Sequence, residues 1–218
     1  MTLVVPVKVT ANNFDCSLFK YAFLDFGSSR SFCTTDLAKS LGLSGDIEEC
    51  TIHTANGSRP HVGNSVSFRI CGVNESDDLS VDNILTFDDI PDLQDSIPHQ
   101  EIVQRYAHLH DLSFPRLEST IDILIGSDVL GRHPISATRV GEEGSPTAYH
   151  TVLGWALAGP DKNAEIINNA DINFLQTDTA SKFLNDSPFC HICGHDFVDL
   201  YADPCTTEFL VDDRKHYV

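Results

Sequence analysis

The segment FLDFGSSRSF (residues 23–32) places an acidic side chain between an apolar run and a loop of glycine and serine. Apolar residues fill most of 18–24, which predicts a β-strand. Asp25 then ends the strand, and Gly27 and Ser28 begin the loop, where backbone amides can donate hydrogen bonds to a carboxylate. By itself this pattern is typical of a structural turn aspartate, so the role of Asp25 depends on the elements around it.

The elements on either side of this segment have clear local signals. Valines alternate over 5–9 and predict a first strand, which forms a β-hairpin with 18–24. After the loop, residues 34–36 read TTD, a good helix N-cap, and Gly42 stands where the helix would end. We therefore expect a hairpin, the loop at Asp25, and then a short helix.

A second hairpin is predicted further along the chain. The segment 50–58, followed by 62–71, places the pair Asn56-Gly57 between two alternating runs, which is the strongest short hairpin signal. Strands are also expected at 79–87, at 121–126 and at 151–159. The last of these contains the only tryptophan and ends before Pro160. These strands predict a mostly β domain, with weak helix around 102–109.

Charge and cysteine content limit the classes of function. The net charge is −18, which disfavours partners such as nucleic acid and anionic lipid, because these attract Lys and Arg. Nine acids lie between Glu75 and Glu101 without a Lys or Arg, and we expect a solvated surface insertion there. No apolar run is long enough to span a membrane, and the start lacks an export signal. With seven cysteines in an irregular pattern, we expect an intracellular, cytoplasmic protein with reduced thiols.

Four motifs follow one another along the chain, and together they are far more specific than any one of them. They are FLDFGSSRSF at 23–32, TANG at 54–57, ILIGSD at 123–128 and LGWALAGP at 153–160. Together they resemble the catalytic segment, the flap, the second signature and the closing motif of the aspartic peptidases of Pao/BEL-type retrotransposon polyproteins. The resemblance covers residues 1–160.

This resemblance implies a mostly β, closed-barrel, retropepsin-like protease subunit over 1–160, followed by a polyprotein linker or partial further segment over 161–218. It implies a homodimer in which Asp25 of each subunit meets its symmetry mate. Two carboxylates that close cannot both ionise readily, so the pair would share a proton and act as acid and base. Gly27 and Ser28 would shape the catalytic loop, and no metal or organic cofactor is implied.

The resemblance also implies how a substrate is held. Ala55, Asn56 and Gly57 would form a flap that closes over an extended peptide and excludes water. The implied substrate is the element's own polyprotein, and the implied reaction is hydrolysis of its peptide bonds.

The residue after the catalytic aspartate differs from the family pattern. The family has Ser or Thr there, and this chain has Phe26. In active relatives that hydroxyl is buried at the dimer axis and hydrogen-bonds across it, which phenylalanine cannot do. The alternative is therefore a catalytically silent module that keeps the fold for dimerisation or peptide binding.

A third interpretation concerns the C-terminal cysteines and histidines. Cys190 and Cys193 form a Cys-x-x-Cys pair, and Cys205 and His216 could complete four zinc ligands. The spacing between the two pairs is irregular. We therefore expect unpaired thiols in preference to a zinc-dependent interaction module.

Overall fold

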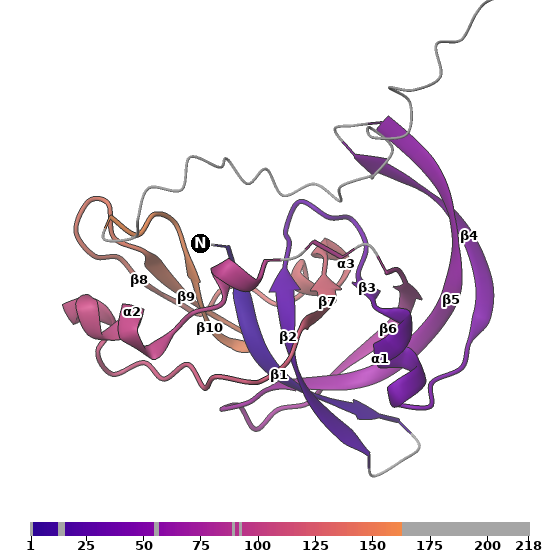
Figure 1. Cartoon of the computed structure of the whole chain (residues 1–218), viewed down its shortest axis with the longest axis horizontal. Helices are drawn as coiled ribbons and strands as arrows, with labels where there is room; N and C mark the ends of the chain where they lie inside the picture. The colour runs from indigo at the N-terminus through magenta and orange to yellow at the C-terminus, as the bar shows by residue number, and fades with distance from the viewer. Residues whose placement is uncertain (1, 13–15, 55–56, 89, 92, 163–218) are drawn as a thin grey trace, which may run out of the picture. The chain divides into compact units, whose positions relative to one another are not determined.

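A closed β-barrel forms the centre of the described chain (Figure 1). The computed structural model describes residues 2–12, 16–54, 57–88, 90–91 and 93–162. Six strands follow one another in the order β1, β2, β7, β3, β6, β5, and β1 also pairs with β5 to close the ring. The strand β4 pairs with β5 outside the ring. The strands are β1 (Val4–Ala11), β2 (Ser17–Leu24), β3 (Phe32–Cys33), β4 (Asp46–Thr54), β5 (Gly57–Gly72), β6 (Leu79–Thr86) and β7 (Ile121–Ile125). The predicted mostly β, closed-barrel class is confirmed at this level.

Both faces of the central strands are buried. Side chains alternate between the two faces of a strand, so Ala22 and Leu24 face one way and Phe23 the other. The first face belongs to a core cluster with Val5, Val7, Val9, Phe68, Ile123 and Ile125. The second face belongs to a cluster with Val4, Tyr21, Phe32, Leu85 and Leu124. This explains why the strands are apolar at nearly every position.

The acidic stretch is solvated as expected, with six of its seven described acids exposed, but it is not an insertion. It includes β6, a strand of the barrel, and the short 3₁₀ helix η1 (Gln94–Ser96). Leu93 and Ile97 are buried in the cluster on the second face of the central strands. The acids are therefore interleaved with apolar residues that cover the barrel, a pattern that a count of charges does not reveal.

The short helices lie where strands end. The helix α1 (Thr35–Ser40) is capped by the Thr34 hydroxyl, which accepts a hydrogen bond from the Leu37 amide at 3.2 Å. It ends before Gly42, whose positive φ of 63° suits a helix terminus. The remaining helical elements are α2 (Gln100–Arg105), the 3₁₀ helix η2 (Ala107–Leu109) and α3 (Ser127–Leu130). The predicted first helix and the weak helix near 102–109 are confirmed.

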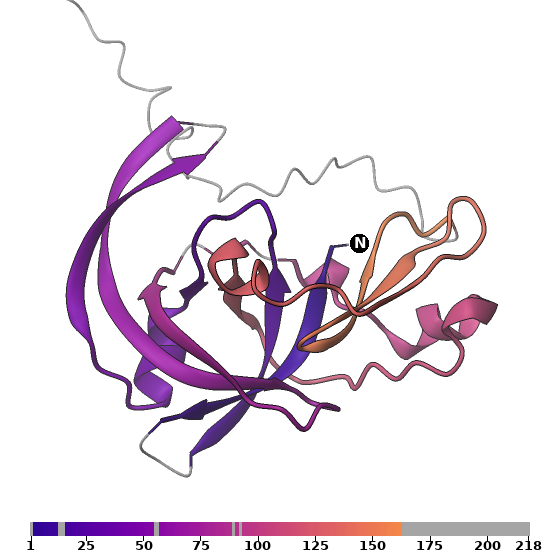
Figure 2. The same cartoon turned by 180° about the vertical axis from the view of Figure 1, so that it is seen from behind.

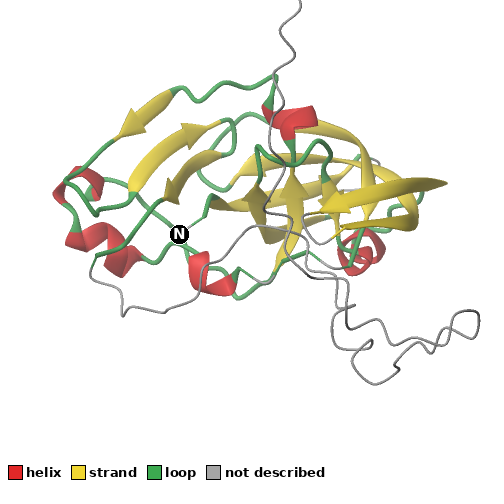
Figure 3. Cartoon of the chain, turned by 90° about the horizontal axis from the view of Figure 1, so that it is seen from above, coloured by secondary structure: helices red, strands yellow, loops and turns green. Residues whose placement is uncertain are grey.

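A separate three-stranded sheet follows the barrel strands (Figure 3). It contains β8 (Ala137–Arg139), β9 (Thr147–Thr151) and β10 (Gly154–Ala158). The strand expected at 151–159 is present as β10 but begins later, because Thr151 ends β9 and the chain turns at 152–153. The Thr151 hydroxyl donates to the Gly154 carbonyl at 2.8 Å, and Gly154 has a φ of 96°, which suits glycine.

One buried acid links the barrel strands. Asp122 on β7 forms an ion pair with Lys20 at 2.9 Å and accepts from the hydroxyls of Thr34 and Thr120 at 2.9 and 2.7 Å. Burial raises the pKa of Asp122, but the Lys20 ammonium and the two hydroxyls together lower it below its usual value. Asp122 is therefore a stabilising anion at neutral pH.

No helix in the described part of the chain combines the length and the apolar character needed to cross a membrane.

Candidate active site

Two neighbouring strands bring the sequence-predicted loop and the second motif together. β2 and β7 run parallel, with Leu24 opposite Ile125. Both strands therefore end at the same edge of the barrel, so Asp25 and Gly126 emerge side by side. The Asp25 amide donates to the Ile125 carbonyl at 2.9 Å, which fixes the backbone where the loop begins.

The Asp25 side chain is held by its own loop. The Gly27 amide donates to Oδ1 of Asp25 at 2.9 Å, and the Ser28 amide donates to the Asp25 carbonyl at 3.2 Å. A Cβ atom at Gly27 would lie 3.2 Å from the same Oδ1, so glycine allows the amide to approach the carboxylate. The side chain is half-buried and keeps access to solvent. A carboxylate in this position can exchange protons with a bound molecule.

Ser31 braces the far end of the loop. It is fully buried, and its hydroxyl donates to Oδ1 of Asp128 at 2.7 Å while accepting from the Gly126 amide at 2.9 Å. Its own amide donates to Oδ2 of Asp128 at 3.0 Å. The carboxylate of Asp128 therefore holds the end of the loop that begins at Asp25. Sequence reasoning quoted both residues within motifs but assigned no role to either.

Gly126 allows the two segments to approach each other closely. A Cβ atom there would lie 2.6 Å from the Arg30 carbonyl oxygen and 2.9 Å from the Ser28 carbonyl oxygen. Both distances are shorter than a normal van der Waals contact, so only glycine fits without a shift of the backbone. Next to it, Ser127 donates its amide to the Ser28 carbonyl at 2.8 Å and its hydroxyl to the same oxygen at 2.9 Å. Hydrogen bonds within one subunit therefore hold the loop at 25–31, and Ser28 accepts two of them through its carbonyl oxygen.

The Phe26 ring lies outside the core. Its side chain is 45% exposed in the single chain, directly next to Asp25. It therefore causes no overpacking inside the subunit. The loop presents a carboxylate together with an aromatic surface that another molecule could cover.

The predicted second hairpin is present and long. β4 and β5 pair in antiparallel register from Asp46 opposite Ser65 to Thr54 opposite Gly57. Both views of the fold show the hairpin curving away from the central strands (Figures 1 and 2). Gly57 has a φ of 126°, which suits glycine at a hairpin end. Ala55 and Asn56, the other two expected flap residues, lie outside the described residues.

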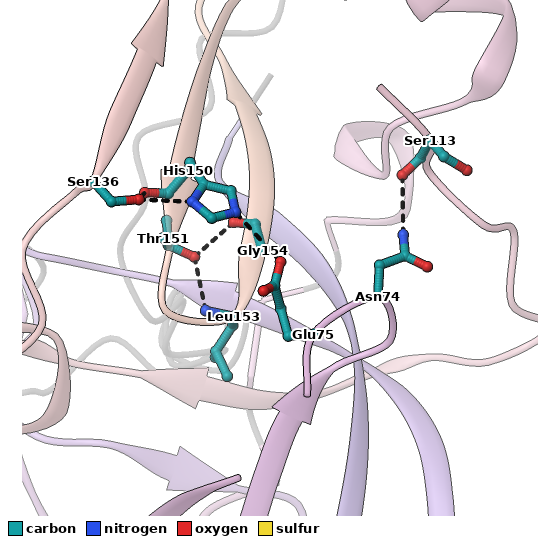
Figure 4. Close-up of polar contacts among 8 residues, drawn as sticks. All are labelled: Asn74, Glu75, Ser113, Ser136, His150, Thr151, Leu153 and Gly154. Carbon is teal, nitrogen blue, oxygen red and sulfur yellow. Dashed lines mark hydrogen bonds and ion pairs between the residues drawn. The ribbon is translucent and has the colours of Figure 1, made fainter. Parts of the chain in front are cut away.

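A second polar row links the barrel to the small sheet (Figure 4). The Ser136 hydroxyl and Nδ1 of His150 are 2.6 Å apart, and Nε2 of His150 lies 3.3 Å from the Glu75 carboxylate. The order serine, histidine, acid is that of a hydrolase triad. However, the neighbouring cavity beside Glu75 and Trp155 measures about 30 Å³, room for about one water molecule. The row fits a structural brace better than a substrate site.

Side chains that commonly bind metal ions do not gather in the described part of the chain. Within residues 2–162, apart from the gaps given above, no group of three or more His, Cys, Asp or Glu side chains is placed to hold an ion. The sequence-predicted candidate pair, Cys190 and Cys193, lies outside the described residues, as does the expected linker from residue 163 onward.

No protein-family model matches this sequence, and no curated protein matches it.

Proposed function

We propose that this chain is one subunit of a homodimeric aspartic endopeptidase, with Asp25 as the catalytic residue. The observation that carries the proposal is the loop itself: a half-buried carboxylate held by the Gly27 amide, at the end of a barrel strand. The loop is braced to a second motif through Ser31 and Asp128. The resemblance to Pao/BEL-type peptidases predicts a catalytic carboxylate at this point.

In the proposed dimer, the two Asp25 side chains share one proton. The ionised carboxylate takes a proton from a bound water as the water oxygen attacks the peptide carbonyl carbon. The protonated carboxyl gives its proton to the carbonyl oxygen, which forms a neutral tetrahedral intermediate. The carboxyl that took the water proton then gives it to the amide nitrogen while the other carboxylate takes a proton from a hydroxyl of the intermediate. The C–N bond breaks, which releases the amine and the new carboxylic acid and leaves one proton on the pair. Two carboxylates in contact favour this shared state because their repulsion disfavours double ionisation.

The hairpin β4–β5 would cover the substrate. An extended peptide can add main-chain hydrogen bonds to strand-like backbone, and closure of a hairpin over it excludes water from the cleft. Each subunit would contribute one hairpin, with Gly57 at its end. The substrate class that fits is an extended segment of a polyprotein.

A second candidate function is a silent module that dimerises or binds peptide. The observation in its favour is Phe26, which cannot supply the hydroxyl that the family uses at the dimer axis. Each buried group left without its partner there would cost about 1–3 kcal/mol, and the two-fold axis doubles that cost. In contrast, the exposed Phe26 rings would bury apolar surface in a dimer, and this burial would offset part of the free-energy cost of the unpaired groups.

A peptide-library cleavage assay at mildly acidic pH distinguishes these functions. It compares the unchanged protein with Phe26→Ser and Asp25→Asn at one protein concentration. Cleavage by the unchanged protein that disappears in Asp25→Asn supports the protease. Cleavage that appears only in Phe26→Ser supports a preserved fold with an altered dimer axis. If none of the three cleaves, the protease proposal fails, and a monomer at micromolar concentration would favour the silent module.

A further inference from the structure

One ion pair connects the loop of Asp25 to the long hairpin. Arg30 lies in that loop, and its Nη1 and Nη2 atoms donate to the two carboxylate oxygens of Glu48 on β4, each at 2.6 Å. The pair is bidentate, with two guanidinium nitrogens bound to two carboxylate oxygens, which is the strongest geometry for an arginine–carboxylate pair. Hydrogen bonding and charge from Arg30 lower the pKa of Glu48, so the pair is ionised in the neutral range.

The pair lies at the point where the hairpin leaves the barrel. β5 pairs with the barrel strand β6 from Ser65 onward, whereas 57–64 pairs with β4 in the register given above. Glu48 stands opposite Gly63, just on the hairpin side of that boundary. A contact at this position controls the angle of the hairpin more than a contact further inside the barrel would.

The β5 side of the same boundary has its own anchor. The Asn64 amide donates to the Thr86 hydroxyl at 2.9 Å, and Nε2 of His61 lies 2.8 Å from the Thr86 carbonyl oxygen. A Cβ atom at Gly63 would lie 2.5 Å from that oxygen, so the strands are in close contact there. Thr86 therefore fixes β5, and Arg30 fixes β4.

Arg30 also contacts the barrel. Its Nη2 atom donates to the Asn83 carbonyl at 3.3 Å, and Asn83 has a φ of 59°, in the left-handed region that turns its carbonyl out of the regular strand pattern. The arginine thus connects three segments: the loop after Asp25, the hairpin strand β4 and the barrel strand β6.

We propose that Arg30 is a positioning residue that couples the hairpin β4–β5 to the Asp25 loop through Glu48. The coupling rests on the proposed function only for its catalytic consequence, since the contacts exist within one subunit. When the hairpin moves, Glu48 displaces Arg30 through the ion pair, and the loop then shifts the Asp25 carboxylate. Substrate that closes the hairpin would in this way stabilise the shape of the loop.

Hydrogen exchange followed by mass spectrometry tests the coupling without any need for activity. The full chain is compared with Glu48→Gln, which keeps the shape and removes the charge. We expect amide exchange to rise roughly 2- to 10-fold, both in the hairpin (49–63) and in the loop (25–31). The doubly reversed variant Arg30→Glu with Glu48→Arg should restore part of the protection.

A matched control uses another ion pair, which joins β5 to the residue before β6. Arg69 and Asp78 are 3.1 Å apart and lie away from the boundary. Asp78→Asn should leave exchange in the hairpin and the loop at the level of the unchanged protein. If peptide cleavage is measurable, Glu48→Gln should raise KM more than it lowers kcat, because the hairpin holds the substrate.

The outcomes separate this inference from the protease proposal. Increased exchange in both segments supports the coupling whether or not the protein cleaves peptides. Increased exchange in the hairpin alone, or no change in either segment, overturns the coupling even if the protein is an active protease. Failure of the reversed pair to restore protection, with the variant still folded, also overturns it.

Discussion

Replacing Ser31 by alanine should destabilise the domain strongly for a change of one atom. The hydroxyl is fully buried and serves both the Gly126 amide and the Asp128 carboxylate. Leaving the buried amide without a partner costs about 1–3 kcal/mol, and a lost hydrogen bond to a charged group costs about 1.5–3 kcal/mol where that group keeps no other donor. Asp128 still accepts from the amides of Ser31 and Val129, so we expect a total of about 2–4 kcal/mol.

Urea unfolding followed by circular dichroism measures this loss, with Ser29→Ala as the control. Ser29 is an exposed serine in the same loop, so its replacement should change the free energy of unfolding by less than about 0.5 kcal/mol. For a domain of this size the Ser31→Ala loss corresponds to a fall in Tm of roughly 4–16 °C. A loss below about 0.5 kcal/mol would show that the network does not hold the loop.

Three further predictions concern other buried positions. Ionised Asp122 stabilises the fold above its ordinary pKa of 3.8, and this effect is lost as the pH falls through the lower pKa of the folded state. The free energy of unfolding should therefore drop more between about pH 5 and pH 3 in the unchanged protein than in Asp122→Asn. Equal slopes of the free energy of unfolding against pH in the two proteins would refute this. Burial, together with nearby carboxylates, raises the pKa of the Cys33 thiol to about 12. Iodoacetamide at about pH 8 should therefore label the exposed Cys16 and leave Cys33 unmodified. Equal labelling of the two cysteines in a peptide map would contradict this prediction. Gly126→Ala should lower the free energy of unfolding by about 1–3 kcal/mol, because the new Cβ atom would clash with the Arg30 carbonyl oxygen. An unchanged midpoint of chemical unfolding would show that the two loops can separate freely.

Local signals in the sequence were sufficient for much of the barrel. The Asn-Gly pair predicted the hairpin β4–β5, and the Thr34 cap predicted the start of α1, because both depend on residues close in sequence. Asp25 was correctly placed at the end of a strand for the same reason. Whether it is catalytic stays a prediction.

The interactions that shape the site could not be read from the sequence. Ser31 and Asp128 are 97 residues apart, and the pairing of β7 with both β2 and β3 brings their segments together. The contact between Arg30 and Glu48 depends equally on the path of β4. The run at 151–159 was read as one strand because its apolar pattern continues through a turn that Gly154 permits.

The claim that two subunits build one active site can be tested by mixing subunits. Unchanged protein is kept at a concentration where sedimentation shows a dimer, and an equal amount of Asp25→Asn is added and equilibrated. Random pairing would place about half of the unchanged subunits in mixed dimers with a single Asp25, so peptide cleavage should fall to about half. Cleavage that is unaffected by the inactive subunit, or a cleaving protein that sediments only as a monomer, would contradict the two-subunit site.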